Sequence, residues 1–333
     1  MRALTLIVRN LATSELADSN KQCPALDSFL ARSVVATDLL QSTTGWICAA
    51  FGVKRQNDWP VGAILAQARE APGVSAFWVC ANPVHLAIDR DSLILQPLSE
   101  LRISDQESQA LASAIRAHFA TEQLEMIHID TGVWVVGALH DQNLSTTELA
   151  LAEGRSVDGL LPTGADAPWW QRMVTEAQMI LHDHPVNIAR EQRGEVPINS
   201  LWIWGGGTAP VIQKSFDTMH AADALLRALA ALSGTPLMDL PGDALDIPLD
   251  HRYLVEFVVT DKPGTTGSIS ALETDWIAPA WRALGTGRLD ELTLIVPLPN
   301  AIAVCQCDRK ARRRFWRRNR TLTRLLGQWQ ARS

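Results

Sequence analysis

The stretch that most constrains this chain of 333 residues runs from Leu181 to Pro210 and reads LHDHPVNIAREQRGEVPINSLWIWGGGTAP. It contains an apolar run, Leu201 to Trp204, that is followed at once by Gly205, Gly206 and Gly207. A short apolar run bounded by turn residues is typical of a buried strand in a mostly parallel sheet, and glycine lets a backbone turn sharply or approach a ligand closely. Because ligands of open α/β sheets bind beyond the carboxyl ends of the strands, the stretch predicts a ligand site at a sheet edge.

The rest of the chain predicts a core with an insertion. From Pro168 to Val296 amphipathic helices alternate with apolar strands, which indicates an α/β sheet with helices on its faces. Leu4 to Val8 predicts a further strand. From about residue 59 to residue 160 a capping box, Ser104 to Glu107, and a hairpin, Met126 to Val136, occur without regular alternation. We therefore expect an α/β core and a smaller α+β insertion.

The composition is that of a soluble globular protein, since 47% of the residues are hydrophobic and 20% are charged. No apolar run reaches the roughly 18 residues of a membrane span, and no signal peptide precedes the first predicted strand. The five cysteines include no CxxC pair, which favours reduced thiols. Cys305 and Cys307 face one side of a predicted strand, where packing is the simpler interpretation than a metal or redox role. We expect a cytoplasmic protein without a membrane span.

The charge of the chain is unevenly distributed. Ten of its 30 basic residues lie between Arg309 and Arg332, where no acidic residue occurs, and the other 20 stand against 36 acidic residues. Phe315, Leu322, Leu326 and Trp329 recur in this tail at helical spacing. One interpretation is a terminal helix that docks its apolar stripe on the core. The alternative is an element that binds nucleic acid or another anion.

The central stretch resembles a known enzyme family. The residues that carry the likeness are His184-Pro-Val-Asn187, Arg190, Gly194, Pro197, Asn199 and Trp202-Ile-Trp204-Gly-Gly-Gly207. They are similar to a run in the archaeal-type, cofactor-independent phosphoglycerate mutases of the alkaline phosphatase superfamily. The likeness is closer still to a bacterial group of mutase-like proteins, regulatory protein of RpfE type, over Thr175 to Gly207, Asp58 to Ala63 (DWPVGA) and Phe77 to Leu86 (FWVCANPVHL).

This resemblance implies an alkaline-phosphatase-like α/β core with a mostly parallel sheet, helices on both faces and an inserted lid-like α+β domain. We expect the core to comprise residues 1–58 and 165–308, the insertion residues 59–164, and a basic C-terminal helix residues 309–333.

The resemblance also implies a catalytic apparatus that this chain does not carry over. The mutases use two divalent metals, held mostly by Asp and His, and a serine that carries the phosphoryl group, because metals neutralise phosphate charge and activate the nucleophile. Where a metal-binding aspartate should follow the first strand, this chain reads Val8-Arg9-Asn10, and an arginine cannot ligate a cation. The nearest counterparts of the serine are Thr43 and Thr44, with Ser42 adjacent.

The two other motifs are altered as well. The family pattern ATDxxGHxGD is reduced here to Asp261, Gly264 and Gly267, with Thr265 in place of the histidine and Ser268 in place of the final acid. Hydroxyls are poor ligands for such metals. An arginine-rich motif of the lid is reduced to Asp89-Arg90-Asp91. The resemblance therefore implies an inherited fold and a degenerate metal site.

The loop region predicted from His184 to Gly207 should line the former cleft. Its ligand-binding candidates are His184, Asn187, Arg190, Asn199, Trp204, Gly205, Gly206 and Gly207. Guanidinium groups suit carboxylate and phosphate ligands. The alternative for Asn187, Arg190 and Arg193 is a set of hydrogen bonds that fixes the loop, and Trp202 and Trp204 are better interpreted as core than as stacking residues.

A metal, if one binds, would be held by His182, Asp183, His184 and Asp261. The alternative for the two histidines is hydrogen bonding at a helix end. We expect no catalytic residue and no cofactor, with Mn²⁺ or Zn²⁺ as the alternative.

Together these patterns predict a phosphoglycerate-mutase-like regulatory protein that binds an anionic small molecule or a protein partner. The alternatives are an active metal-dependent phosphomutase or phosphatase with a rebuilt site, and a nucleic-acid-associated regulator that uses Arg309 to Arg332.

Overall fold

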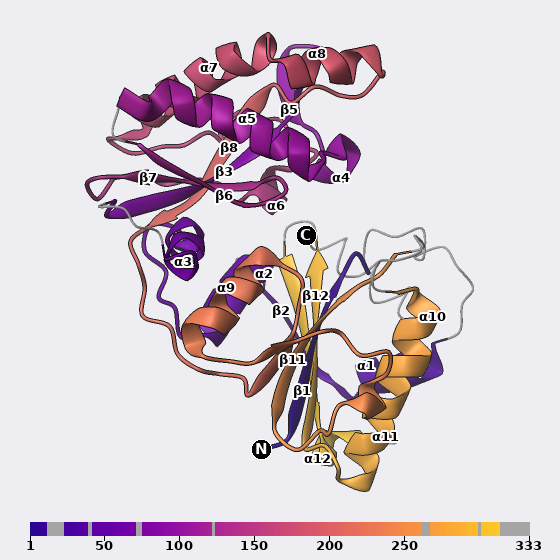
Figure 1. Cartoon of the computed structure of the whole chain (residues 1–333). Helices are drawn as coiled ribbons and strands as arrows, with labels where there is room; N and C mark the ends of the chain where they lie inside the picture. The colour runs from indigo at the N-terminus through magenta and orange to yellow at the C-terminus, as the bar shows by residue number, and fades with distance from the viewer. Residues whose placement is uncertain are drawn as a thin grey trace. The chain divides into compact units, whose positions relative to one another are not determined.

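The computed structural model describes residues 1–11, 23–38, 42–70, 75–121, 124–260, 267–298 and 301–313. The chain divides into two compact units: unit 1 comprises Met1–Phe51 and Gln213–Ser333, and unit 2 comprises Gly52–Ile212 (Figure 1). Unit 2 is one continuous segment inserted between the two parts of unit 1. The insertion predicted over residues 59–164 lies within unit 2, which continues to Ile212.

Unit 1 is built on one large sheet. Its strands are β1 (Ala3–Arg9), β2 (Val34–Asp38), β9 (Thr218–His220), β10 (Leu237–Met238), β11 (Arg252–Val258), β12 (Glu291–Leu298) and β13 (Ala301–Asp308). They form a seven-stranded sheet in the order β10-β9-β11-β1-β12-β13-β2. β1 is parallel to both of its neighbours, whereas β13 is antiparallel to β12 and to β2. The predicted α/β class with a mostly parallel sheet is confirmed.

Helices cover both faces of this sheet (Figure 1). They are α1 (Pro24–Arg32), α2 (Thr43–Ala50), α9 (Ala224–Ser233), α10 (Ile269–Ala271), a π-helical segment (Leu272–Ile277), α11 (Ala278–Thr286) and α12 (Arg309–Arg312), with a 3-10 turn at Ala244–Asp246. Leu4, Leu6 and Val8 of β1 pack in one apolar cluster with residues of α1 and α11. α2 and α9 lie on the opposite face (Figure 1). Helices on both faces explain why β1 reads as a continuous apolar run.

An ion pair joins the amino ends of β1 and β12. The Arg2 backbone N–H donates to Asp290 Oδ2 at 3.0 Å, and Arg2 Nη2 donates to Asp290 Oδ1 at 2.8 Å. These hydrogen bonds from Arg2 lower the pKa of Asp290 to about 2. A lowered pKa stabilises the fold above the ordinary carboxyl pKa of about 4, and this contribution is lost as the pH falls to about 2.

Asp290→Asn is therefore expected to flatten the acid side of the stability profile. The urea midpoint should fall less steeply between pH 4 and pH 2 than it does in the wild type. Arg2→Gln should remove most of the same pH dependence because Arg2 causes the shift. Parallel profiles for wild type and Asp290→Asn would contradict the assignment.

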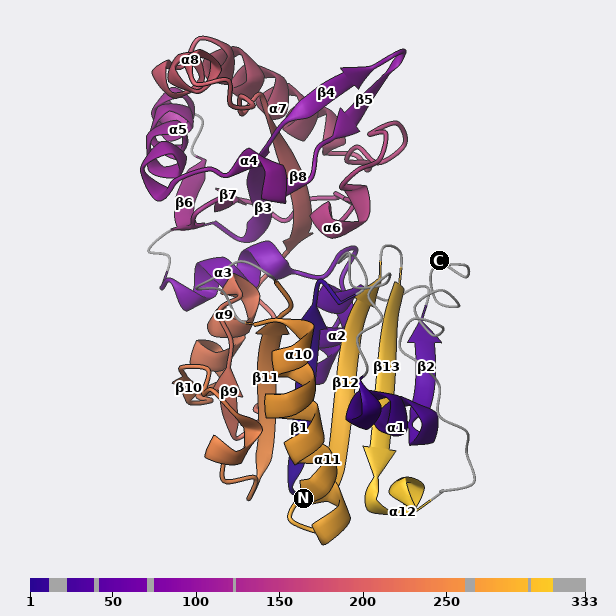
Figure 2. The same ribbon diagram turned by 90° about the vertical axis from the view of Figure 1, so that its right-hand side faces the viewer.

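Unit 2 contains a smaller sheet and a separate hairpin. The strands of the sheet are β3 (Phe77–Val84), β6 (Glu125–Asp130), β7 (Val133–Ala138) and β8 (Ser200–Gly207), and the hairpin consists of β4 (Leu86–Asp89) and β5 (Ser92–Leu95). The four-stranded sheet has the order β6-β7-β3-β8 with antiparallel neighbours throughout. The predicted hairpin is confirmed as β6 and β7. The β4–β5 hairpin extends away from the rest of unit 2 (Figure 2).

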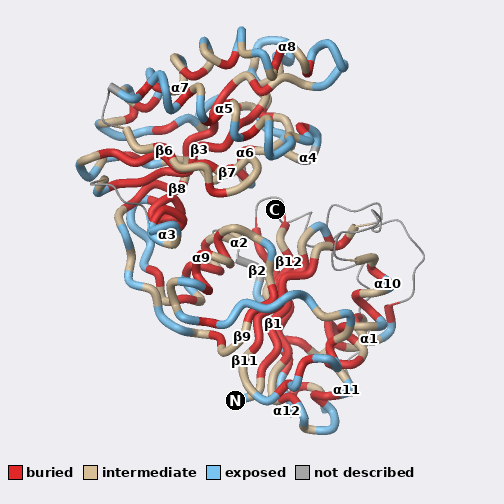
Figure 3. Tube along the Cα trace, in the orientation of Figure 1, coloured by how far each residue is buried: buried red, intermediate tan, exposed pale blue. Residues whose placement is uncertain are grey.

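The placement predicted for Leu201 to Trp204 in a mostly parallel sheet is wrong. These residues belong to β8, which is antiparallel to β3 at one edge of the smaller sheet. The helices of unit 2 are α3 (Val61–Ala68), α4 (Leu98–Leu101), α5 (Asp105–His118), α6 (Leu149–Ala152), α7 (Ala167–His182) and α8 (Pro185–Gln192), with a 3-10 turn at Phe119–Thr121. α7 and α3 lie on opposite faces of the sheet (Figure 1), so β8 is buried along most of its length (Figure 3). This double coverage, and not parallel pairing, produces the apolar run.

Two helix signals had different outcomes. The capping box of α5 is confirmed, since Ser104 Oγ accepts from the Glu107 N–H and the Glu107 carboxylate accepts from the Ser104 N–H. The segment after His184, which we expected to be a loop, is the helix α8, with Pro185 in its first turn. Proline suits the first helical position because its missing N–H has no helical partner there. In the described part of the chain no helix is long and apolar enough to cross a membrane.

Candidate functional site

The carboxyl ends of several strands meet at one edge of the large sheet, which we call the carboxyl edge. β1 is parallel to β11 and β12, and β2 points the same way because two antiparallel pairings separate it from β12. In open α/β sheets this edge is where ligands bind. Arg9 is the last residue of β1 and therefore lies at it. Alternation along the strand directs Arg9 away from the face of Leu4, Leu6 and Val8, toward the face of α2 and α9.

Arg9 binds two carboxylates from separate elements. Its Nε donates to Glu256 Oε1 of β11, and its Nη2 lies 3.0 Å from Asp223 Oδ2 at the start of α9. Burial alone would lower the pKa of the guanidinium, but the charges of Asp223 and Glu256 outweigh burial, and the pKa of Arg9 is raised. The group thus stays a cation. We call Arg9, Glu256 and Asp223 the Arg9 cluster.

Glu256 connects this cluster to the start of α9. Its side chain is 4% exposed, and its Oε2 accepts from the backbone N–H groups of Ala222 and Asp223, each at 2.9 Å. Asp223 also caps α9, because its Oδ1 accepts from Leu225 N–H at 3.0 Å. Neither Glu256 nor Asp223 was predicted from the sequence to be a site residue. A charged residue inside the apolar run YLVEFVV was the available signal, since buried carboxylates are rare unless they are paired.

The described residues of the carboxyl edge do not fit the divalent metals that the resemblance implies. Arg9 has no lone pair for a metal, and its guanidinium holds the carboxylates of Glu256 and Asp223. Within the described ranges, no group of three or more His, Cys, Asp or Glu is placed to hold a metal ion. Asp261 and Thr265 lie outside the described residues.

The counterpart of the serine begins α2. Ser42 caps this helix, because its Oγ accepts from the Gly45 N–H at 2.9 Å. Thr43 and Thr44 follow in the first turn and are partly exposed. A hydroxyl in the first turn of a helix is favourably placed for an anion, since backbone N–H groups and the helix dipole point toward it.

The candidates of the central stretch lie in unit 2, and their polar groups are used within it. His184 caps α8 through Nδ1, which accepts from the Val186 N–H at 3.2 Å, and burial lowers the pKa of His184. Asn187 is buried, and its Nδ2 donates to the carbonyls of Leu181 and Ile198 at 2.7 Å each. Its Oδ1 accepts from the Ile198 N–H at 2.8 Å. Asn187 thus joins α7, α8 and the approach to β8.

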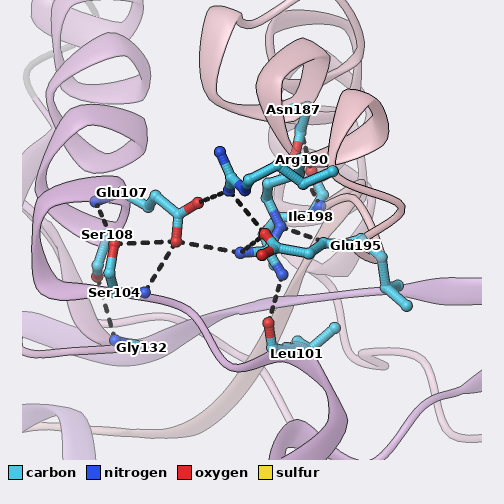
Figure 4. A network of polar contacts seen from close by, with 11 residues as sticks. Leu101, Ser104, Glu107, Ser108, Gly132, Asn187, Arg190, Glu195 and Ile198 are labelled. Atoms are coloured by element: carbon cyan, nitrogen blue, oxygen red, sulfur yellow. Dashed lines mark hydrogen bonds and ion pairs between the residues drawn. The ribbon is translucent and has the colours of Figure 1, made fainter.

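Arg190 is the largest fully buried charged side chain in the described part of the chain and is 1% exposed. Nε donates to Val196 O at 2.8 Å, Nη2 donates to Leu101 O, and Nη1 lies 3.1 Å from Glu107 Oε2 (Figure 4). Arg193 reaches the other oxygen of Glu107 at 2.8 Å. The interpretation of hydrogen bonds that fix the chain therefore describes both arginines.

Asn199 and Trp204 make comparable contacts. Asn199 Oδ1 accepts from the Leu86 N–H at 2.8 Å, and its Nδ2 donates to Leu86 O at 2.9 Å, which fixes the start of the β4–β5 hairpin. Trp204 Nε1 donates to Asn82 Oδ1 at 2.7 Å. Trp202 is buried in an apolar cluster that Trp204 also contacts. Both tryptophans thus pack as core residues.

The glycine triplet lies against the protein's own residues. Cβ atoms added to Gly206 and Gly207 would lie 2.8 Å from Phe77 Cζ and 2.6 Å from Pro60 Cβ, respectively. Gly205 has a φ of 68°, in the left-handed region that favours glycine. The close approach predicted from the triplet is therefore an approach to neighbouring chain segments.

His182 and Asp183 lie at the end of α7. Their side chains are 84% and 91% exposed, and His182 Nε2 is 3.9 Å from Asp183 Oδ1. Metal sites usually combine three or more ligands in a protected position. The geometry of this pair therefore gives the predicted metal set no support beyond its sequence spacing.

Only the first residues of the basic tail are described. Arg312 Nε donates to Trp281 O of α11 at 3.1 Å, and the guanidinium lies 4.8 Å from the centroid of the Trp281 ring. Arg309 lies 4.0 Å from Asp290. These contacts favour docking for the start of the tail. Phe315 to Trp329 lie outside the described residues.

Comparisons with known proteins point to one class of enzyme. No family model matches the chain. The 2,3-bisphosphoglycerate-independent phosphoglycerate mutase of Methanosarcina acetivorans is 28% identical over 149 residues, which are 42% of this chain and 37% of that enzyme. A probable enzyme of the same name from Geobacter sulfurreducens is 27% identical over 157 residues, 46% of this chain and 39% of that protein. The chain thus matches well under half the length of these relatives.

A solved structure of a Pyrococcus horikoshii protein covers 92% of this chain and 87% of its own, with a TM-score of 0.50 and 14% identity. At this identity the likeness shows a common fold alone.

The relatives also correct one expectation. We expected no cofactor. The 2,3-bisphosphoglycerate-independent phosphoglycerate mutases normally use metal ions, so this expectation is wrong for proteins of this kind. The chain is similar, at low identity and over less than half of its length, to the 2,3-bisphosphoglycerate-independent phosphoglycerate mutases.

Proposed function

We propose that this chain is a phosphoglycerate-mutase-like protein with a regulatory role. Its altered carboxyl edge binds a ligand or a protein partner and does not transfer phosphoryl groups. The observation that carries the proposal is the Arg9 cluster. Arg9 lies where the resemblance assigns a metal-binding aspartate, and its guanidinium is bound to Glu256 and Asp223.

Phosphoryl transfer depends on cations that neutralise the moving phosphoryl group and on an activated nucleophile. A guanidinium can neutralise charge, but it cannot activate a hydroxyl in the way a metal does, because it has no site for an oxygen ligand. Arg9 is also already neutralised by two carboxylates. These properties support binding more than catalysis at this edge.

The regulatory part of the proposal is supported by the resemblance to the RpfE-type group. The ligand would be an anionic small molecule or a protein partner, and Thr43 and Thr44 at the start of α2 are the described groups best placed for an anion. In unit 2 the motif residues Asn187, Arg190 and Asn199 donate hydrogen bonds to backbone carbonyls, so a chain that keeps the fold without the chemistry would retain them.

The proposal predicts that the full chain, supplied with Mn²⁺, Co²⁺ or Zn²⁺, does not interconvert 3-phosphoglycerate and 2-phosphoglycerate above a protein-free blank. A coupled assay checks this, with the Methanosarcina acetivorans enzyme as the positive control under identical conditions. Metal-dependent turnover that copurifies with the chain and is lost on Thr43→Ala/Thr44→Ala substitution would overturn the proposal. Calorimetric titration with 3-phosphoglycerate then tests whether the ligand is an anion of this kind.

A further inference from the structure

The Arg9 cluster brings two carboxylates of different elements to one cation. Glu256 comes from β11 and Asp223 from the start of α9, and both contact the guanidinium of Arg9. Glu256 is buried and also accepts two backbone hydrogen bonds from the start of α9. Two neighbouring carboxylates repel each other unless a cation lies between them. The cation therefore holds the start of α9 against β1 and β11.

We propose that Arg9 is the built-in cation of the carboxyl edge and neutralises there the charge that a divalent metal neutralises in the mutases the chain resembles. This inference rests on the proposed function of the same edge. The inference assigns a single role to Arg9, the residue that departs most from the family's motif.

A single substitution at the position of Arg9 is enough to replace a metal ligand by a cation. The resemblance assigns the end of the first strand to an aspartate that ligates a metal, and here that position supplies the guanidinium. One change from acid to arginine removes a metal ligand and introduces a positive charge. Because the fork of arginine has donors in fixed directions, it can bind two carboxylates at once, and Arg9 does so through Nε and Nη2.

Removal of the guanidinium should convert the cluster into a cation site. Arg9→Asn leaves the carboxylates of Glu256 and Asp223 without their counter-ion and adds an amide oxygen, and oxygen ligands of this kind suit Mn²⁺. The substitution leaves the buried carboxylate of Glu256 without its counter-ion, which is strongly destabilising, so the Tm of the metal-free variant should fall by roughly 5 °C or more. A divalent ion should reverse much of that fall because it stabilises the state that binds it.

The experiment compares Mn²⁺ binding and thermal unfolding of the full-length chain in wild type, Arg9→Asn and Arg9→Asn/Glu256→Gln. Electron paramagnetic resonance counts bound Mn²⁺, and scanning calorimetry gives Tm with and without the ion. We expect Arg9→Asn to bind one more Mn²⁺ than the wild type and to regain Tm when Mn²⁺ is added. The double variant should lose both effects because it lacks the Glu256 charge.

An Mn²⁺ count equal to that of the wild type in Arg9→Asn, or binding that persists in the double variant, would overturn the inference. If Arg9→Asn does not fold without metal, refolding in the presence of Mn²⁺ should recover it, and failure to do so also counts against the inference. Arg9→Lys is the matched control, since it keeps a cation and should bind no additional Mn²⁺. Turnover by the wild type would refute the proposed function, whereas Mn²⁺ binding by the variants tests the role of Arg9.

Discussion

Replacement of Arg190 by alanine is expected to destabilise unit 2 by about 3–5 kcal/mol, the usual cost of removing one partner from a buried ion pair. The side chain is 1% exposed and serves Val196 O, Leu101 O and the carboxylate of Glu107 at the same time. Its removal leaves two backbone carbonyls without their hydrogen-bond donors and creates a cavity that alanine cannot fill. Urea unfolding followed by tryptophan fluorescence measures the change.

Arg193 provides a matched control because it binds the same carboxylate from a different environment. Its side chain is 49% exposed, and it lies 2.8 Å from Glu107 Oε1. An exposed pair of this kind contributes less than about 1 kcal/mol. Equal losses in Arg190→Ala and Arg193→Ala would show that the shared charge pair, and not the buried network of Arg190, determines the effect.

Gly62→Ala is the second substitution with a large expected effect, about 3 kcal/mol of destabilisation. Gly62 lies in α3 where the helix crosses β3, and an added Cβ would be 2.6 Å from the carbonyl carbon of Val79 and 2.8 Å from that of Trp78. Both contacts are to backbone, so no side-chain rotation can relieve them. The helix or the strand must move, and the packing on that face of the smaller sheet is lost.

The control for this substitution is Gly154→Ala, also in unit 2. Gly154 has a φ of 72° but no atom within 4 Å of an added Cβ, so alanine there adds only backbone strain, about 1 kcal/mol. Urea unfolding of both variants separates steric overlap from strain. A Gly62→Ala chain as stable as Gly154→Ala would mean that α3 can shift without cost.

Two local signals in the sequence predicted local structure correctly, whereas the helix α8 was expected to be a loop. The capping box at Ser104 and the hairpin of β6 and β7 depend on residues that are close in sequence, and both are present in the structure. The alternation of strands and helices after Pro168 predicted the α/β class of unit 1. It did not predict that the run of β8 belongs to another sheet, because burial on both faces looks the same in parallel and antiparallel pairing.

The candidate site was harder to predict, for a different reason. Asn187 and Arg190 have side chains that could bind a ligand, and sequence alone does not reveal that backbone carbonyls occupy them. The partner of Arg9 could not be found from Arg9 itself, since Glu256 follows it by 247 residues. The pairing depends on the register of β1 against β11, which only the folded sheet establishes.

The insertion of unit 2 into unit 1 determines the order in which a ribosome can complete them. β1 pairs with β11 and β12, and Ala3 lies opposite Arg252, so the strand synthesised first has no neighbour for roughly 10 to 50 s of elongation. The smaller sheet, by contrast, is complete once β8 has emerged. All strands of the smaller sheet are therefore synthesised before the partners of β1. In that interval the apolar strand β1 is the segment that a nascent-chain chaperone would need to shield.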